Sequence, residues 1–318
     1  MSTREGSSEV AASSGPYLLG AFGLFLVWSN SFIAASYLLG TESAQARFDW
    51  VSLSVARFAP IFPICLIFCL TVGRADAVRL LRAHPVRLVV CSLLAVPGYN
   101  LALYYGQQHG VPPPIASLTT ALVPLFVMIL AALFLGEHLT LRRALAFCLA
   151  CFGLVVIALS KGESGAIAEY GLTLGITALA PLSWSIYSIL SKPVSGAASP
   201  LVWTYLNIVV GSVPLLLLLP LRGGREMAEL PLDGWAALSY LSILCTVLGY
   251  AIWTWLLRHL PASTVGFTVF MNPPLTSVNI VILSFLFPAV FVLEVGGLEW
   301  LGGGLALGGM ALALWPGD

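Results

Sequence analysis

IASLTTALVPLFVMILAALFL, residues 115–135, is the stretch of sequence that decides the fold. It contains no charged residue, and its only hydroxyl side chains are one serine and two threonines. A helix of roughly 20 apolar residues is what a hydrocarbon core of about 30 Å requires. An unbroken apolar run also differs from the alternating pattern of a membrane β-barrel strand. The stretch is therefore predicted to be a transmembrane helix.

Similar runs repeat along the chain and predict an all-α integral membrane protein with ten transmembrane helices. The expected spans are 17–39, 51–73, 87–108, 115–135, 141–159, 170–190, 201–221, 235–257, 263–286 and 296–315. The composition agrees, since 59% of the 318 residues are apolar and 9% are charged, against roughly 25% charged in ordinary globular proteins. No room remains for a soluble domain. Residues 1–16 are rich in Ser, Ala and Gly and are expected to form a disordered cytoplasmic tail.

The distribution of Lys and Arg predicts the orientation of the chain in the membrane. With the N-terminus inside, four basic residues fall on the outer side, Arg57 lies within a span, and nine lie on the cytoplasmic side. These nine are Arg4, Arg74, Arg79, Arg82, Arg87, Arg142, Arg143, Lys192 and Arg258. Both termini are therefore expected in the cytoplasm. The net charge is zero, so nucleic acid is not an expected partner.

Three short motifs occur twice at nearly constant spacing, which indicates an internal duplication. The matched pairs are Gly98-Tyr99 with Gly249-Tyr250, Pro124 with Pro273, and Trp28 with Trp184, at offsets of 151, 149 and 156 residues. Five spans per copy would turn the second copy over in the membrane. We therefore predict two inverted five-helix repeats, 17–160 and 161–318, an architecture that holds substrate near the midplane of many secondary transporters. Chance similarity between apolar helices is the alternative.

Polar side chains deep inside the expected spans predict where a solute binds, because such groups normally face a cavity or the bundle interior. The expected lining of rings, amides and one guanidinium suits a small solute with apolar and polar parts. The candidate substrate-binding residues are Trp28, Asn30, Arg57, Tyr99, Asn100, Trp184, Tyr187, Tyr250, Trp253 and Asn272. Arg57 is expected to pair with a carboxylate of the solute. A structural ion pair or outward snorkelling of Arg57 is the alternative.

Motifs of enzymes and ATP-driven pumps are missing from the sequence. It has no P-loop, no Gly-x-Ser-x-Gly and no His-Glu-x-x-His motif. Cys148 and Cys151 have the spacing of a thiol pair, but no His or acid lies near them in their apolar span. We therefore predict that the protein is not an enzyme and holds no metal or cofactor. Gly304 and Gly308 form a helix-packing motif, expected to act within the chain or, alternatively, in a dimer.

Five further stretches carry a family resemblance. They are residues 23–29 (GLFLVWS), 116–125 (ASLTTALVPL), 133–137 (LFLGE), 142–143 (RR) and 152–156 (FGLVV). Together with the ten expected spans, they resemble the drug/metabolite transporter superfamily in its ten-helix EamA-type branch, over about residues 17–315. The second copy departs from the pattern, because residues 285–288 (FLFP) stand where an ending like LFLGE is expected.

The resemblance implies a secondary carrier in the inner membrane of a bacterium, which exports amino acids or related amphipathic metabolites from a cavity between the repeats. Its partners would be a small-molecule substrate and the lipid bilayer, with the protein a monomer or homodimer. We expect it to work by alternating access. A channel or receptor-like module without alternating access is the alternative. For Glu137, both a helix-capping role and proton coupling remain open.

Overall fold

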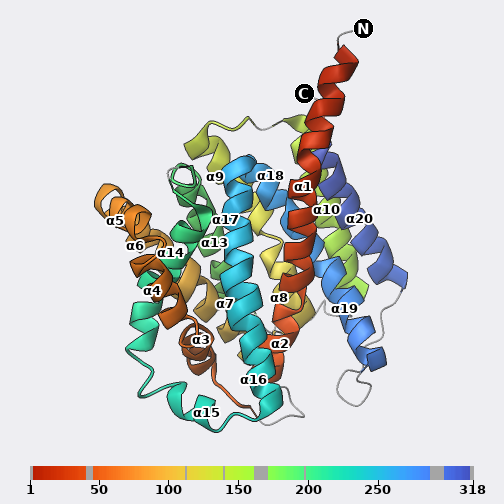
Figure 1. The fold of residues 1–318 in the computed structure, drawn as a ribbon. Coiled ribbons are helices and arrows are strands. Elements are labelled where there is room, and N and C mark those ends of the chain that lie inside the picture. The colour runs from red at the N-terminus through yellow and green to blue at the C-terminus, as the bar shows by residue number, and fades with distance from the viewer. Residues whose placement is uncertain are drawn as a thin grey trace.

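The computed structural model describes residues 3–40, 46–111, 113–138, 140–160, 171–196, 198–286 and 297–315. Every regular element within these ranges is a helix, as an all-α membrane protein requires. Figure 1 shows the helices packed side by side, with the start of α1 and the end of α20 at the same end of the bundle.

The first half consists mostly of short helices between the longer α1 and α10. Its elements are α1 (Thr3–Ser29), α2 (Ser31–Leu39), α3 (Trp50–Phe58), α4 (Phe62–Leu70), α5 (Arg74–Ala83), α6 (Pro85–Leu93), the π-helix η1 (Leu94–Gly98), α7 (Tyr99–Gln108), α8 (Pro113–Thr120), α9 (Val123–Leu135) and α10 (Leu141–Ser160).

The second half repeats much of this pattern. Its elements are α12 (Gly171–Thr177), α13 (Leu179–Ser191), α14 (Pro200–Leu216), α15 (Gly224–Ala228), α16 (Leu232–Ser239), the π-helix η3 (Tyr240–Leu248), α17 (Gly249–His259), α18 (Ala262–Phe267), the 3-10 helix η4 (Thr268–Met271), α19 (Asn272–Leu286) and α20 (Gly297–Leu314). Among the described residues, a π-helix thus lies at each Gly-Tyr pair: η1 ends at Gly98, and η3 ends directly before Gly249.

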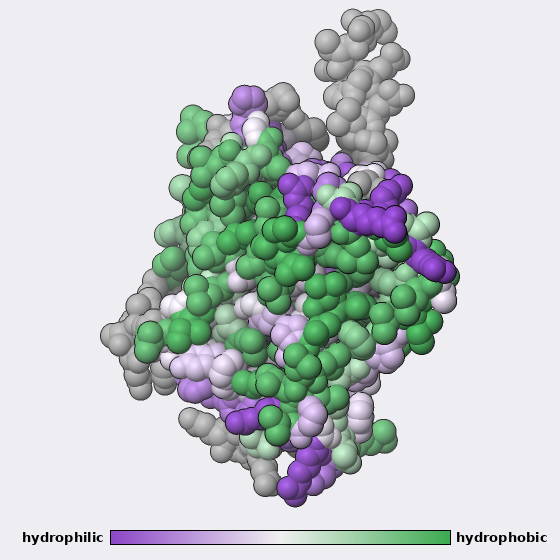
Figure 2. Space-filling model, turned by 90° about the vertical axis from the view of Figure 1, so that its left-hand side faces the viewer, coloured by the Kyte–Doolittle hydropathy of each residue, from purple (hydrophilic) through white to green (hydrophobic). Residues whose placement is uncertain are grey.

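Seven helical segments in the described ranges are long and apolar enough to cross a membrane, against ten expected from the sequence. They are Gly15–Leu39, Trp50–Leu70, Pro85–Gln108, Ala116–Leu135, Leu172–Ser191, Leu232–His259 and Ala262–Leu286. The three other expected spans coincide with α10, α14 and α20; the apolar helices Pro200–Leu216 and Trp300–Leu314 are shorter. Figure 2 shows a broad hydrophobic face between hydrophilic residues at its upper and lower ends, as lipid contact requires.

The N-terminal segment differs from its expectation, because α1 already begins at Thr3 and continues through Pro16 into the first span. Residues 3–16 are therefore helical in the structure rather than disordered.

Several spans are interrupted near their middle, and these breaks position the cavity described below. The helix α8 ends at Thr120 and α9 begins at Val123, next to Pro124, which lacks a backbone N–H donor. In the second half, α18 passes into the 3-10 helix η4, and α19 begins at Asn272, next to Pro273. The proline pair found in the sequence thus marks equivalent breaks.

Close helix packing between α10 and α20 depends on glycines other than the expected pair. A Cβ atom on Gly153 would lie 2.4 Å from the carbonyl oxygen of Gly302, and one on Gly309 would lie 2.5 Å from that of Ala146. Gly304 and Gly308, by contrast, have no such neighbour within 4 Å among the described residues. The expectation that these two glycines pack the helix within the chain was wrong, because they lie on the other face of α20.

Candidate functional site

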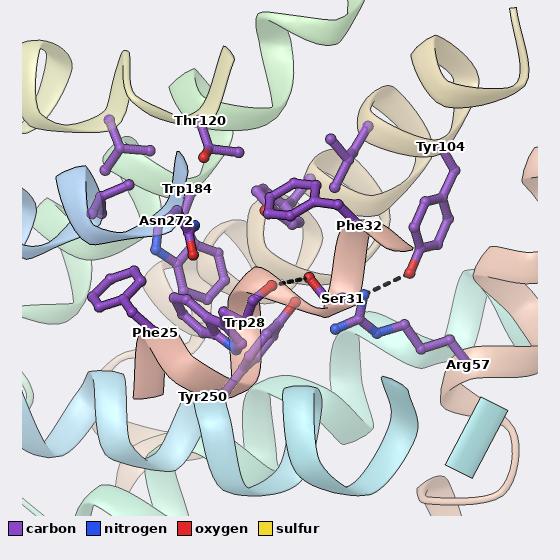
Figure 3. Close-up of a pocket in the computed structure, with 14 residues that line it drawn as sticks. Phe25, Trp28, Ser31, Phe32, Arg57, Tyr104, Thr120, Trp184, Tyr250 and Asn272 are labelled. Carbon is purple, nitrogen blue, oxygen red and sulfur yellow. Dashed lines mark hydrogen bonds between the residues drawn. The ribbon is translucent and has the colours of Figure 1, made fainter. Parts of the chain in front are cut away.

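A cavity lies where the interrupted spans of both halves meet. Its lining residues are Phe25, Trp28, Ser31, Phe32, Arg57, Tyr99, Leu103, Tyr104, Thr120, Val123, Trp184, Tyr250, Val269 and Asn272. Figure 3 shows these side chains converging from helices that are far apart in the sequence. The volume open to the centre of a water molecule is only about 30 Å³. A solute of metabolite size therefore needs the lining residues to move apart.

Arg57 is the charged residue of this lining and is held by neutral partners. Its Nε donates to the Thr246 hydroxyl at 2.8 Å, and its Nη1 donates to Asn100 Oδ1 at 3.0 Å and to the Tyr104 hydroxyl at 2.6 Å. The side chain is only 4% exposed. These three bonds use Nε and Nη1 and hold the guanidinium in place.

The guanidinium has no anionic partner in the part of the chain that the structure describes. None of the lining residues is acidic. The ion pairs lie elsewhere, for instance between Arg222 and Asp49 and between Arg47 and Asp233. A buried unpaired ion costs several kcal/mol, roughly, relative to a paired one. The cavity is thus electrostatically suited to an anionic group.

Aromatic rings form one continuous wall of the cavity. The Trp184 ring lies 5.4 Å from Trp28, 4.8 Å from Tyr250 and 5.3 Å from Tyr99, measured between ring centroids. Edge-to-face contacts at such distances are favourable, because ring edges are positive and faces negative. This wall offers apolar surface to a solute beside the guanidinium.

Each π-helix accepts a hydrogen bond from a side chain of the other half. Widening a helix to π geometry disturbs its regular backbone bonding, and such bulges are frequent at functional sites. The Trp28 indole in the first half donates to the Cys245 carbonyl oxygen in η3 at 2.9 Å. The Tyr250 hydroxyl in the second half donates to the Ala95 carbonyl oxygen in η1 at 3.1 Å. Each half therefore holds the π-helix of the other.

Two segments of the chain, residues 21–159 and 171–315, match the model of the EamA-like transporter family. The chain belongs to this family. It is a multi-pass membrane transporter in which the family unit occurs twice, in agreement with the duplication inferred from the paired motifs.

Relatives of this EamA-like transporter include the "Uncharacterized transporter YyaM" of Bacillus subtilis (strain 168), 25% identical over 80% of this chain and 82% of the relative. A "Probable terminal-alkyne amino-acid exporter" of Streptantibioticus cattleyicolor is 28% identical over 63% of this chain and 66% of its own. A "Probable amino-acid metabolite efflux pump" of Salmonella typhimurium is 30% identical over 49% of this chain and 57% of its own. A solved crystal structure with 19% identity covers 94% of this chain and 96% of its own, with a TM-score of 0.71, which shows the same fold.

The ten candidate residues of the EamA-like transporter divide into two groups. Those that line the cavity are Trp28, Arg57, Tyr99, Trp184, Tyr250 and Asn272. Of the other four, Asn100 holds Arg57, Tyr187 contacts the Thr254 hydroxyl, and Trp253 donates to the Ser188 hydroxyl. Asn30 bonds the Leu26 carbonyl oxygen of its own helix, beside the break between α1 and α2.

Sequence reasoning did not place several lining residues in the site. Phe25, Ser31, Phe32, Leu103, Tyr104, Thr120, Val123 and Val269 are the additional ones. Most are apolar or hydroxyl side chains that look like ordinary residues of a membrane helix. Tyr104 did carry a signal, because it lies four residues after Asn100 and therefore on the same helix face. A search for polar groups that could reach Arg57 would have found Tyr104 together with Asn100.

Glu137 connects the end of α9 to the start of α18 in the other half. Its carboxylate accepts hydrogen bonds from the backbone N–H groups of Ala262 at 2.7 Å and Ser263 at 3.2 Å, and also from the Ser263 hydroxyl. A carboxylate at the N-terminus of a helix satisfies free N–H groups and complements the helix dipole. The structure thus places Glu137 in a capping position, one of its two expected roles.

Proposed function

We propose that this EamA-like transporter is a secondary carrier that exports small carboxylate-bearing, partly apolar metabolites, such as amino acids or related solutes, by alternating access. The observation that carries the proposal is Arg57, a buried cation with neutral partners in a cavity walled by aromatic rings. A carboxylate supplies the missing charge and forms strong, directional bonds with a guanidinium. The rings bury the apolar part of the same solute.

The proposed architecture is ten spans arranged as two inverted five-helix repeats. Its support is the reciprocal pattern of the two halves: Trp28 contacts Tyr250 at 6.3 Å, and the matching Trp184 contacts Tyr99 at 5.3 Å. A pseudo-two-fold axis between the two halves would relate the Trp28–Tyr250 contact to the Trp184–Tyr99 contact. Inverted repeats provide alternating access by rocking around a midplane site.

The proposed direction and orientation rest on charge and on relatives. Nine basic residues on one side favour a cytoplasmic position for that side and for both termini. Two of the relatives are named as a probable amino-acid exporter and a probable amino-acid metabolite efflux pump. We therefore place the protein in a bacterial inner membrane and its substrate in the cytoplasm.

The test of this function measures solute binding by the purified wild-type protein and by Arg57→Gln. Ligand binding raises the midpoint of thermal unfolding with occupancy. We expect amino acids and simple carboxylates to raise the unfolding midpoint of the wild type. Arg57→Gln should lose the shift caused by carboxylates and keep the shift caused by neutral analogues. Arg222→Gln is the matched control, because Arg222 forms an exposed ion pair with Asp49. Equal loss for charged and neutral solutes would contradict the proposal.

Counterflow in proteoliposomes separates a carrier from the channel alternative. We expect unlabelled solute on the far side to accelerate entry of labelled solute, because an alternating-access carrier returns faster when loaded. A channel gives no such trans-stimulation. Its absence, with binding intact, would favour the channel.

A further inference from the structure

Two polar groups on the cavity wall have no hydrogen-bond partner in the described part of the chain. The indole Nε1 of Trp184 and the amide Oδ1 of Asn272 are both buried and unbonded. Each side chain is 3% exposed, and each lines the cavity. A buried polar group without a partner costs about 1–3 kcal/mol. Both groups are therefore placed to bind something that enters the cavity.

These groups are separate from the guanidinium. In Figure 3, Asn272 and Trp184 lie on one side of the view and Arg57 on the other, with Ser31 between them. The bonds of Arg57 go to Thr246, Asn100 and Tyr104, not to either of these residues. A solute whose carboxylate contacts Arg57 must therefore reach Asn272 and Trp184 with another of its atoms.

The chemistry of the Trp184 indole and the Asn272 amide determines which functional group of the solute they can bind. The Trp184 indole can only donate, so it requires an acceptor, whereas the Asn272 amide both accepts and donates. An ammonium has no acceptor for the indole, and no carboxylate lines the cavity to balance its charge. A hydroxyl or a carboxamide is neutral and both donates and accepts.

We infer that Asn272 and Trp184 form a second polar subsite for a neutral hydroxyl or carboxamide. The inference rests on the proposed function and narrows its substrate class to monocarboxylates that carry such a group at the end away from the carboxylate. This subsite distinguishes solutes that share the same carboxylate and the same carbon chain.

The experiment is a matched panel of straight-chain carboxylates with four to seven carbons, in which only the terminal group changes. For five carbons, the members are pentanoate, 5-hydroxypentanoate, 4-carbamoylbutanoate and 5-aminopentanoate. Binding to the full-length protein is measured by thermal shift and by tryptophan fluorescence. We expect the best hydroxyl or carboxamide member to bind about five- to tenfold more tightly than its plain and ammonium counterparts, the effect of one to two neutral hydrogen bonds.

Two variants locate the preference. Asn272→Leu keeps the branched shape and the number of heavy atoms of the side chain, and Trp184→Phe keeps a ring while removing the indole N–H. We expect each variant to reduce the preference for a terminal hydroxyl to about twofold or less, while binding still depends on the carboxylate. We expect Arg57→Gln to lose the dependence on the carboxylate and to keep the preference for the hydroxyl. Trp203→Phe is the control, because its indole bonds the Ser191 hydroxyl away from the cavity. If Asn272→Leu does not fold, the result for Trp184→Phe alone tests the second polar subsite.

The outcomes separate the two proposals. If no carboxylate binds, or if Arg57→Gln changes nothing, the proposed function fails and this inference falls with it. If carboxylates bind through Arg57 but terminal hydroxyl, carboxamide and methyl groups bind equally at every chain length, only the second subsite is overturned. A preference that survives in both Trp184→Phe and Asn272→Leu overturns it as well.

Discussion

The indole nitrogen of Trp28 lies 2.9 Å from the carbonyl oxygen of Cys245, a residue 217 positions later in the chain. Cys245 belongs to the π-helix η3, and Gly249 follows directly after that helix. A Cβ atom on Gly249 would lie 2.4 Å from the same indole nitrogen. The hydrogen bond and the glycine therefore both contribute to the close fit between the first helix of one half and the π-helix of the other.

Trp28→Phe tests the bond. The variant keeps an aromatic ring but leaves the buried Cys245 carbonyl without its donor, and we expect a loss of about 1–2 kcal/mol in unfolding free energy. Thermal unfolding of the purified protein measures this loss. Trp203→Phe removes another buried indole bond outside the cavity. Both variants should lose stability, whereas only Trp28→Phe should weaken solute binding; an equal effect on binding would contradict the assignment.

Gly249→Ala tests the close approach. The added methyl group must displace the Trp28 ring or the backbone, and we expect a loss of about 1–3 kcal/mol, as for overpacked cores. Gly23→Ala is the matched control, since a Cβ atom there would have no neighbour within 4 Å among the described residues. In a helix, this change alone stabilises by up to about 1 kcal/mol. Similar melting temperatures for the two variants would show that the contact is unimportant.

Much of this fold follows from hydropathy, because lipid forces the backbone of each span to satisfy itself as helix. The residue range 115–135, for example, coincides closely with the segment Ala116–Leu135. The length and hydropathy of a span do not reveal where its helix is interrupted. Asn30 looked like a candidate ligand, yet it lies at the break between α1 and α2 and bonds its own helix.

Gly309→Ala and Gly308→Ala form a pair of adjacent substitutions with opposite expected signs. A methyl group on Gly309 would lie 2.5 Å from the Ala146 carbonyl oxygen, so we expect destabilisation of about 1–3 kcal/mol. Gly308 has open space in the structure, so alanine there should stabilise the helix by up to about 1 kcal/mol. Unfolding midpoints in detergent measure both. Destabilisation by Gly308→Ala, accompanied by loss of an oligomer, would instead indicate a contact between two copies of the chain.

Glu137→Gln tests the cap between the two halves. Glutamine can still accept a hydrogen bond but lacks the charge that complements the N-terminus of α18, and we expect a loss of about 0.5–2 kcal/mol. Glu229→Gln is the control, because Glu229 pairs with Arg225 on the surface. Proton coupling through Glu137 makes a different forecast. If Glu137 couples transport to protons, Glu137→Gln would abolish the dependence of transport on a pH gradient while leaving counterflow intact.

The site was predictable to the extent that its residues are chemically unusual inside a membrane. Arg57 stands out in an apolar span, and Trp184 and Asn272 are polar-tipped residues within apolar segments. The partners that fix Arg57 are less conspicuous. Thr246 looks like a helix-packing residue, and its contact with Arg57 depends on the fold, because the two are 189 positions apart. Apolar lining residues such as Val123 and Val269 carry no signal of their own.

The small free volume of the cavity also determines the order of events in binding. The rings of Trp28 and Trp184 must separate before or while a solute enters, so the measured affinity includes the free energy of that opening. If opening comes first, the observed rate of binding levels off at high solute concentration at the opening rate. The same indoles fluoresce, so the protein carries its own reporter for this step in a stopped-flow experiment.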